Sequence, residues 1–166
     1  ARFGSAVAIH RDLLVVGAPD EDVSVEAGAG RAYIYSRSAS GNDWTTSATV
    51  DIDATLGPDG PQAGAGFGSS VDVINDTTDW VAAGAPSATE LGGATVGAGA
   101  VFVFDGIGTY KAGFTPAGGT GVQTFGTDLR LRLNGPAVEL VAGANRSNFA
   151  ASLAGHAFVY SNTSGS

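Results

Sequence analysis

Short apolar runs separated by clusters of Gly, Pro, Asn and Asp occur along the whole chain of 166 residues. Leu13–Val16 and Val101–Phe104 are the clearest runs, and no polar residue interrupts either of them. Apolar runs of this length between turn-forming residues indicate β-strands. An unbroken apolar run further indicates a strand that is buried on both faces of its sheet. The pattern therefore predicts a protein built of short, buried strands.

These strand signals recur in three copies with the same internal order. Each copy opens on a Phe-Gly pair, and the pairs lie 64 and 58 residues apart: Phe3-Gly4, Phe67-Gly68 and Phe125-Gly126. A middle strand then ends in Gly-Ala followed by Pro or Asn, at Gly17 with Pro19, Gly84 with Pro86, and Gly143 with Asn145. A period of this size with several strands in each copy predicts a repeat architecture. Blades stacked in a propeller, with about four strands each, bury such strands on both faces.

The predicted fold is all-β, with antiparallel four-stranded blades that together form one repeat domain. We expect blades at residues 1–66, 67–124 and 125–166, the third without its outer strand. The outer strands of the first two are expected at Trp44–Ile52 and near Tyr110–Thr115. About three blades are fewer than the four to eight of a closed propeller, so the propeller is predicted to be incomplete or open. Its first and last blades are then expected to expose apolar flanks, which promote association.

The Phe-Gly and Gly-Ala-Pro motifs in units of this size resemble the FG-GAP repeat, the blade of integrin α-subunit propellers and of many secreted proteins. The resemblance implies an extracellular or cell-surface, non-enzymatic module for interaction or adhesion. Its expected partners are other protein chains, either identical copies or the rest of a longer polypeptide. Two alternatives stay open: a structural subunit of a filament, sheath or appendage assembled blade to blade, and a lectin-like glycan binder that uses Trp44, Trp80 and Tyr110.

Composition excludes several classes of function. The net charge is −8 with a single Lys, so the basic stripe that nucleic-acid binding needs is missing. No apolar run of 18 residues occurs, so we predict no membrane span. The absence of Cys excludes disulfides, thiolate zinc sites and cysteine nucleophiles. The absence of Met, even at position 1, indicates a chain excised from a longer precursor or a fragment of one.

No cofactor is predicted, although the resemblance raises the question of calcium. The FG-GAP likeness implies a calcium loop between the first two strands of a blade, which corresponds here to His10–Asp12, Ile74–Trp80 and Leu133–Pro136. None of these segments supplies the six to eight oxygens that Ca²⁺ needs. The remaining metal candidates are Asp20, Asp22, Asp76 and Asp79, together with Asp51, Asp53 and Asp59, and we interpret all of them as solvated loop charges.

No catalytic arrangement or phosphate loop is predicted either. The two histidines, His10 and His156, stand in a turn and at a strand start, with no nucleophile placed beside them. The glycine-rich segments 28–30 and 97–99 each precede a strand instead of a helix, so they are interpreted as tight strand entries. Three glycosylation sequons begin at Asn75, Asn145 and Asn162, all in expected loops or the tail.

Overall fold

The computed structural model describes residues 1–38, 43–50, 60–89, 91, 95–116, 121–135, 137–147 and 154–162. These residues form eleven strands in three antiparallel sheets. The predicted all-β class, with blade-like sheets in an open arrangement, is confirmed. The described part of the chain contains no helix long and apolar enough to cross a membrane. Asp51, Asp53, Asp59 and Pro136 lie outside the described residues.

Each sheet is a meander in which neighbouring strands follow one another along the chain. Blade 1 consists of β1 (Ala6–His10), β2 (Leu13–Ala18), β3 (Arg31–Arg37) and β4 (Trp44–Val50). Blade 2 consists of β5 (Ser70–Asn75), β6 (Asp79–Ala85), β7 (Ala100–Phe104) and β8 (Tyr110–Phe114). Blade 3 contains three strands among the described residues, β9 (Phe125–Asn134), β10 (Ala137–Ala144) and β11 (His156–Asn162). The blade boundaries at residues 66/67 and 124/125 stay predictions.

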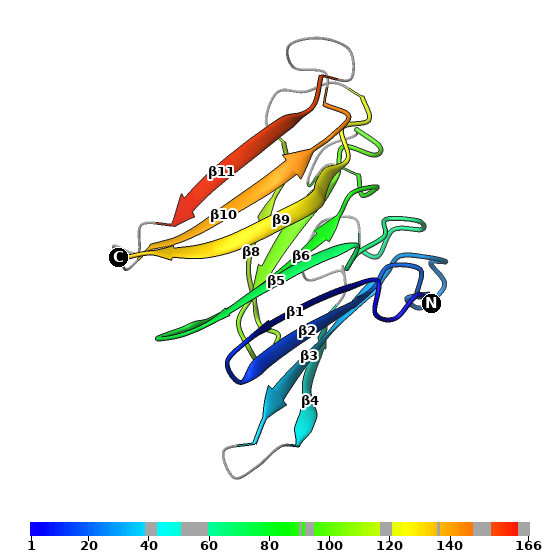
Figure 1. Ribbon diagram of the computed structural model, residues 1–166. Coiled ribbons are helices and arrows are strands. Elements are labelled where there is room, and N and C mark those ends of the chain that lie inside the picture. The colour runs from blue at the N-terminus through cyan, green and yellow to red at the C-terminus, as the bar shows by residue number, and fades with distance from the viewer. Residues whose placement is uncertain are drawn as a thin grey trace.

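The three blades are stacked in chain order, with their first strands side by side (Figure 1). Strand β1 contacts β5, and β5 contacts β9. The later strands of each blade lead away from this line, as the blades of a propeller lead away from its axis. The stack therefore has two ends, one formed by blade 1 and the other by blade 3.

Each blade has two faces because successive side chains of a strand point to opposite sides. We call the front face the one that carries Val7 in blade 1 and the equivalent Val71 and Leu129 in the other blades; the opposite side is the back face. Paired residues across the first three strands match in register from blade to blade: Val7–Val16–Tyr33, Val71–Ala83–Phe102 and Leu129–Ala142–Phe158. Equivalent residues of the sequence repeat thus lie on the same face of each blade.

The core lies between the blades in two separate clusters. In the first cluster, the back face of blade 1, with Val15 and Ile34, packs on the front face of blade 2, with Val71 and Phe102. In the second, the back face of blade 2 packs in the same way on the front face of blade 3. Because strands such as β2 and β7 are covered on both sides, they are apolar at every position, as their sequences predicted.

The Phe-Gly pair joins each blade to the one before it. Phe67 and Phe125 are fully buried, and Gly68 and Gly126 both have a φ of 86°, a conformation in which other residues are strained. The backbone of each pair also bridges the preceding blade in parallel, Phe67 to Gly30 and Phe125 to Gly99. The glycine-rich segments before β3 and β7 are strand entries, as predicted, and they also hold the next blade.

Glycine at the end of the middle strand allows this close approach. A Cβ atom placed on Gly17 would lie 1.9 Å from the carbonyl oxygen of Gly68, and one on Gly84 would lie 2.2 Å from that of Gly126. Pro19 and Pro86 follow directly on the last residues of β2 and β6, where no further ladder hydrogen bond is needed. The Gly-Ala-Pro motif of one blade is therefore the contact surface for the Phe-Gly motif of the next.

Candidate interaction surface

Among the described residues, the front face of blade 1 is an apolar sheet face with no blade packed against it. Val7 and Ile9 are each 64% exposed, whereas the equivalent Val71 and Val73 in blade 2 are each 4% exposed. In blade 3 the equivalent Leu129 is 2% exposed. The same residue types at the same register positions are thus buried in two blades and open to solvent in the first. Exposed apolar surface of this kind marks interaction sites.

An aromatic and polar rim borders this face near the N-terminus. Phe3 is 57% exposed, and its ring meets that of Tyr33 edge to face, with 5.3 Å between centroids. The Tyr33 hydroxyl donates to Glu21 at 2.7 Å, and this hydrogen bond, together with burial, raises the pKa of Tyr33. Arg31 also donates to Glu21, at 2.9 Å. The rim therefore stays hydrogen-bonded while the centre of the face is apolar.

The back face of blade 3 has a different character. Strand β9 places Arg130 and Arg132 on this side, and both are exposed. Arg132 pairs with Glu139 of β10 at 2.6 Å, and the Asn134 amide donates to the same carboxylate at 2.8 Å. The hydrogen bonds from Asn134 and Arg132 lower the pKa of Glu139. The last blade thus exposes two apolar side chains on this flank, Val141 and Val159, as expected, but charged and hydrogen-bonded groups lie beside them.

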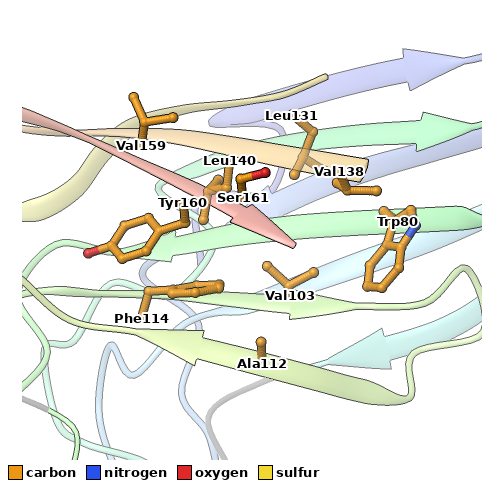
Figure 2. A pocket seen from close by; sticks show the side chains of 10 residues that line it. All are labelled: Trp80, Val103, Ala112, Phe114, Leu131, Val138, Leu140, Val159, Tyr160 and Ser161. Carbon is orange, nitrogen blue, oxygen red and sulfur yellow. The ribbon is translucent and has the colours of Figure 1, made fainter. Parts of the chain in front are cut away.

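An apolar groove of about 570 Å³ runs between blades 2 and 3 (Figure 2). Trp80, Val103 and Phe114 form its blade 2 wall, and Leu140 and Tyr160 belong to its blade 3 wall. The rings of Phe114 and Tyr160, one from each wall, are in contact, with centroids 4.4 Å apart. The corresponding space between blades 1 and 2 contains Tyr110 of β8, packed on Phe104. The groove is thus formed where blade 2 packs against blade 3.

The three aromatic residues considered for glycan binding lie in separate places. Trp80 packs against the second core cluster, and its indole nitrogen donates to the Thr78 hydroxyl at 3.0 Å. Tyr110 packs against the first cluster. The guanidinium carbon of Arg37 lies over the Trp44 ring, 5.8 Å from the centroid of that ring. The structure does not bring them together into one stacking platform.

The metal candidates are likewise dispersed, and each has a protein partner. Asp20 pairs with Arg2, and Asp22 accepts from the peptide N–H of Gly28 at 2.9 Å. Asp76 pairs with Arg11 at 2.5 Å, and Asp79 accepts from Asn75 at 2.6 Å. Within the described residues, no three Asp, Glu, His or Cys side chains gather where they could hold a metal ion.

His10 and the three sequon asparagines lie at the ends of strands or directly after them. His10 accepts the peptide N–H of Asn75 through Nδ1 at 2.9 Å, so it links blades 1 and 2. Asn75 and Asn162 are the last residues of β5 and β11, whereas Asn75 was expected in a loop and Asn162 in the tail. Asn145 is exposed in the turn after β10. Glycosylation at these three residues stays a prediction, which intact-mass measurement before and after glycosidase treatment checks.

Sequence inspection missed the residues that distinguish the two ends of the stack: Val7, Ile9, Arg130, Arg132 and Glu139. A signal was nevertheless present. The segment Leu129–Arg132 alternates apolar and charged residues, which is typical of a strand with one face in water. The equivalent segments of the other blades do not alternate in this way, and that difference alone indicates an outward-facing sheet.

Comparison with known proteins agrees with the geometry. Residues 1–35 match the family model of the FG-GAP repeat. The matched segment contains the Phe3-Gly4 turn, Gly17 and most of the first three strands of blade 1. Repeats of this family are typically non-enzymatic and usually extracellular. No curated protein is significantly similar to the chain in sequence.

Proposed function

We propose that this chain, whose first blade is an FG-GAP repeat, is a non-enzymatic extracellular module for interaction or adhesion between protein chains. The observation that carries the proposal is the front face of blade 1, where Val7 and Ile9 are exposed at positions that blades 2 and 3 bury. Full burial of one aliphatic side chain contributes about 1.5–3 kcal/mol. A partner that covers this face would therefore be stabilised by apolar burial of the kind that already stabilises the two internal joints, between blades 1 and 2 and between blades 2 and 3.

The internal joints indicate which partner fits. At each joint the front face meets a back face that offers small or branched apolar residues, such as Ala32 and Ile34 in blade 1. The Phe-Gly turn meets a glycine, because a side chain there would collide with its backbone. The partner is accordingly another blade-like sheet, from an identical copy or from the rest of a longer polypeptide.

The lectin-like alternative has less support, because Trp44, Trp80 and Tyr110 lie on different surfaces. Sugar binding needs aromatic rings on one accessible platform. The filament alternative requires in addition that the back face of blade 3 accept the front face of blade 1 from another copy.

A mass measurement in solution tests the proposal. We expect light scattering to give a mass above the 16.4 kDa of one chain, and we expect the double variant V7S/I9S to return the mass to that of a monomer. The matched control is V25S/V96S, which changes two valines that are exposed to a similar degree but lie outside the strands. This control should keep the wild-type mass, and circular dichroism should show the same strand signal in all three proteins. A wild-type chain that stays a monomer at every concentration contradicts the proposal.

A further inference from the structure

We propose that the groove between blades 2 and 3 is a docking site for one extended strand of a partner polypeptide, which pairs with the outer edge of β11 and places an aromatic side chain over Ala112 and Phe114 (Figure 2). The inference goes beyond the proposed function, because it concerns a second surface and does not use the front face of blade 1. The joint between blades 1 and 2 shows what fills the same place there.

The blade 2 wall of the groove has an equivalent in blade 1. Ala112 and Phe114 of β8 correspond to Ala48 and Val50 of β4, because each pair lies opposite equivalent residues of the third strand. In blade 1 these two positions are covered by the connection between β7 and β8. A Cβ atom on Gly108 of that connection would lie 2.6 Å from the Ala48 Cβ and 3.1 Å from Cγ1 of Val50. The corresponding surface of blade 2 lines the groove instead.

Strand β8 completes the cover in the joint between blades 1 and 2. Its Tyr110 packs against the first core cluster, with its ring centroid 6.1 Å from that of Phe104. A Cβ atom on Gly113 would lie 2.8 Å from the Tyr110 hydroxyl oxygen, so the ring lies along the strand, over the glycine. The Ser47 hydroxyl also donates to the Gly106 carbonyl at 3.2 Å, which holds the β7–β8 connection on blade 1. A Tyr-x-x-Gly strand thus fills this joint.

Blade 3 has the aromatic residues of such a joint but, among the described residues, no fourth strand. Phe158 and Tyr160 of β11 are the equivalents of Phe102 and Phe104 of β7. The two β7 residues are 0% and 1% exposed, whereas the two β11 residues are only half-buried. Phe114 on the opposite wall is half-buried too. The groove therefore lies where a fourth strand and its aromatic side chain would complete the packing.

The groove follows the outer edge of β11. Three successive residues of this strand line it, Val159, Tyr160 and Ser161. Because successive side chains point to opposite faces, a groove that touches all three runs along the edge of the strand. Strand β11 is the last described strand of its sheet and has β10 on its other side. Edge strands offer peptide groups to an added strand, whose backbone hydrogen bonds give affinity while pockets for alternate side chains give specificity.

The walls of the groove define the chemistry of the partner strand. An aromatic side chain can rest on Ala112 and against Tyr160, and a glycine three residues later leaves room for its ring, as Gly113 does for Tyr110. None of the lining residues is charged, so a charged side chain is disfavoured inside the groove. Blades 2 and 3 are already packed together, with the Phe114 and Tyr160 rings in contact. The site thus exists before the strand arrives, as binding of a separate polypeptide requires.

A synthetic peptide with the sequence of residues 106–116, which contains β8, is a suitable probe. Trp80 lines the groove and Trp44 is the other tryptophan of the chain, so the fluorescence of a W44F variant reports on the groove. We expect the peptide to change this fluorescence in a saturable way. The same peptide with Tyr110→Ser should bind at least about tenfold more weakly, because it lacks the aromatic side chain that the groove buries.

Variants of the chain locate the binding. A112L fills the groove and should weaken the peptide about tenfold, whereas the matched control A27L adds the same side chain in an exposed turn of blade 1 and should not change binding. Hydrogen exchange on the wild-type chain gives a readout that needs no variant to fold. The peptide should slow exchange at Val159–Ser161, and it should leave β4, the outer edge strand of blade 1, unchanged.

Each outcome bears on the inference separately from the proposed function. Absence of binding, equal binding of the serine peptide, or equal protection of β4 and β11 overturns the docking site. A mass in solution that A112L lowers and V7S/I9S does not would show that a second copy occupies the groove, which overturns the partner strand. The variant W44F/V7S/I9S should bind the peptide as W44F does. A wild-type monomer that binds the peptide therefore contradicts the proposed function and leaves this inference intact.

Discussion

Gly17, Gly84 and Gly143 occupy the same position in the three blades, but their surroundings differ. The first two have a neighbouring blade within van der Waals distance of the Cα atom, and Gly143 has open space on that side. None of the three has a positive φ, so backbone conformation does not require glycine at this position. The requirement comes from packing, and it therefore holds only where a blade follows.

Substitution of these glycines by alanine should show the difference directly. We expect G84A to lower the free energy of unfolding by about 3 kcal/mol, because its new methyl group would lie 2.2 Å from the Gly126 carbonyl oxygen. The matched variant G143A should change it by less than about 1 kcal/mol, since the nearest described atom to that methyl group is the Asp128 carbonyl oxygen at 3.8 Å. Urea unfolding followed by circular dichroism measures both values. Equal losses in the two variants would contradict the joint as described.

At the scale of elements, each strand's pattern reflects how many of its faces are covered. Strand β7 is buried at all five positions, whereas β9 alternates between buried and exposed residues along Leu129–Arg132. The connections between strands are stabilised by hydrogen bonds and ion pairs of polar side chains. In the β7–β8 hairpin, the Asp105 carboxylate accepts the peptide N–H groups of Ile107 at 3.1 Å and Thr109 at 2.8 Å, and it pairs with Lys111 at 2.9 Å.

The Asp105 carboxylate in this hairpin should make the free energy of unfolding depend on pH in the acid range. Burial alone raises the pKa of Asp105, but the hydrogen bonds from Lys111, Thr109 and Ile107 together outweigh it and lower the pKa. A carboxyl whose pKa is lowered in the folded state contributes stability above its unfolded pKa, about 4, and loses that contribution as pH falls through the folded value.

We therefore expect D105N to be less stable than the wild type by about 1 kcal/mol at pH 7 and to equal it near about pH 2, where the wild-type carboxyl is protonated too. Urea unfolding at a series of pH values measures the difference, with D43N as the control because Asp43 is an exposed residue outside the strands. A stability difference for D105N that does not change with pH would contradict the proposed role of the charge.

At the scale of the whole molecule, the blades form a stack with unlike ends. The blade 1 end presents an apolar face with Val7 and Ile9. The blade 3 end presents Arg130 and Arg132 beside the exposed Val141 and Val159. Among the described residues, no group of three His, Cys, Asp or Glu side chains could hold a metal ion. Surface contact is what this architecture supports best.

The absence of a calcium requirement is a prediction at this scale. Asp20, Asp22, Asp76 and Asp79 are each engaged by a different protein group, so no loop in the described part of the chain offers a complete set of oxygen ligands. We expect the midpoint of thermal unfolding to be the same in EGTA and in about 1 mM calcium. A site with a dissociation constant of about 10 μM would add about 2.7 kcal/mol under these conditions, and the resulting rise of several degrees would show that the prediction is wrong.

The sequence by itself determined the all-β class, the three-fold repetition and the positions of most strands. It could do so because unbroken apolar runs such as Leu13–Val16, turn glycines and the Phe-Gly pairs are local signals. Only the tertiary structure decided which faces are covered. Val7 and Val71 are the same residue at the same place in the repeat, yet one is 64% exposed and the other 4%. Burial is a property of what lies opposite a residue, and that depends on how whole blades pack, not on the segment that contains it.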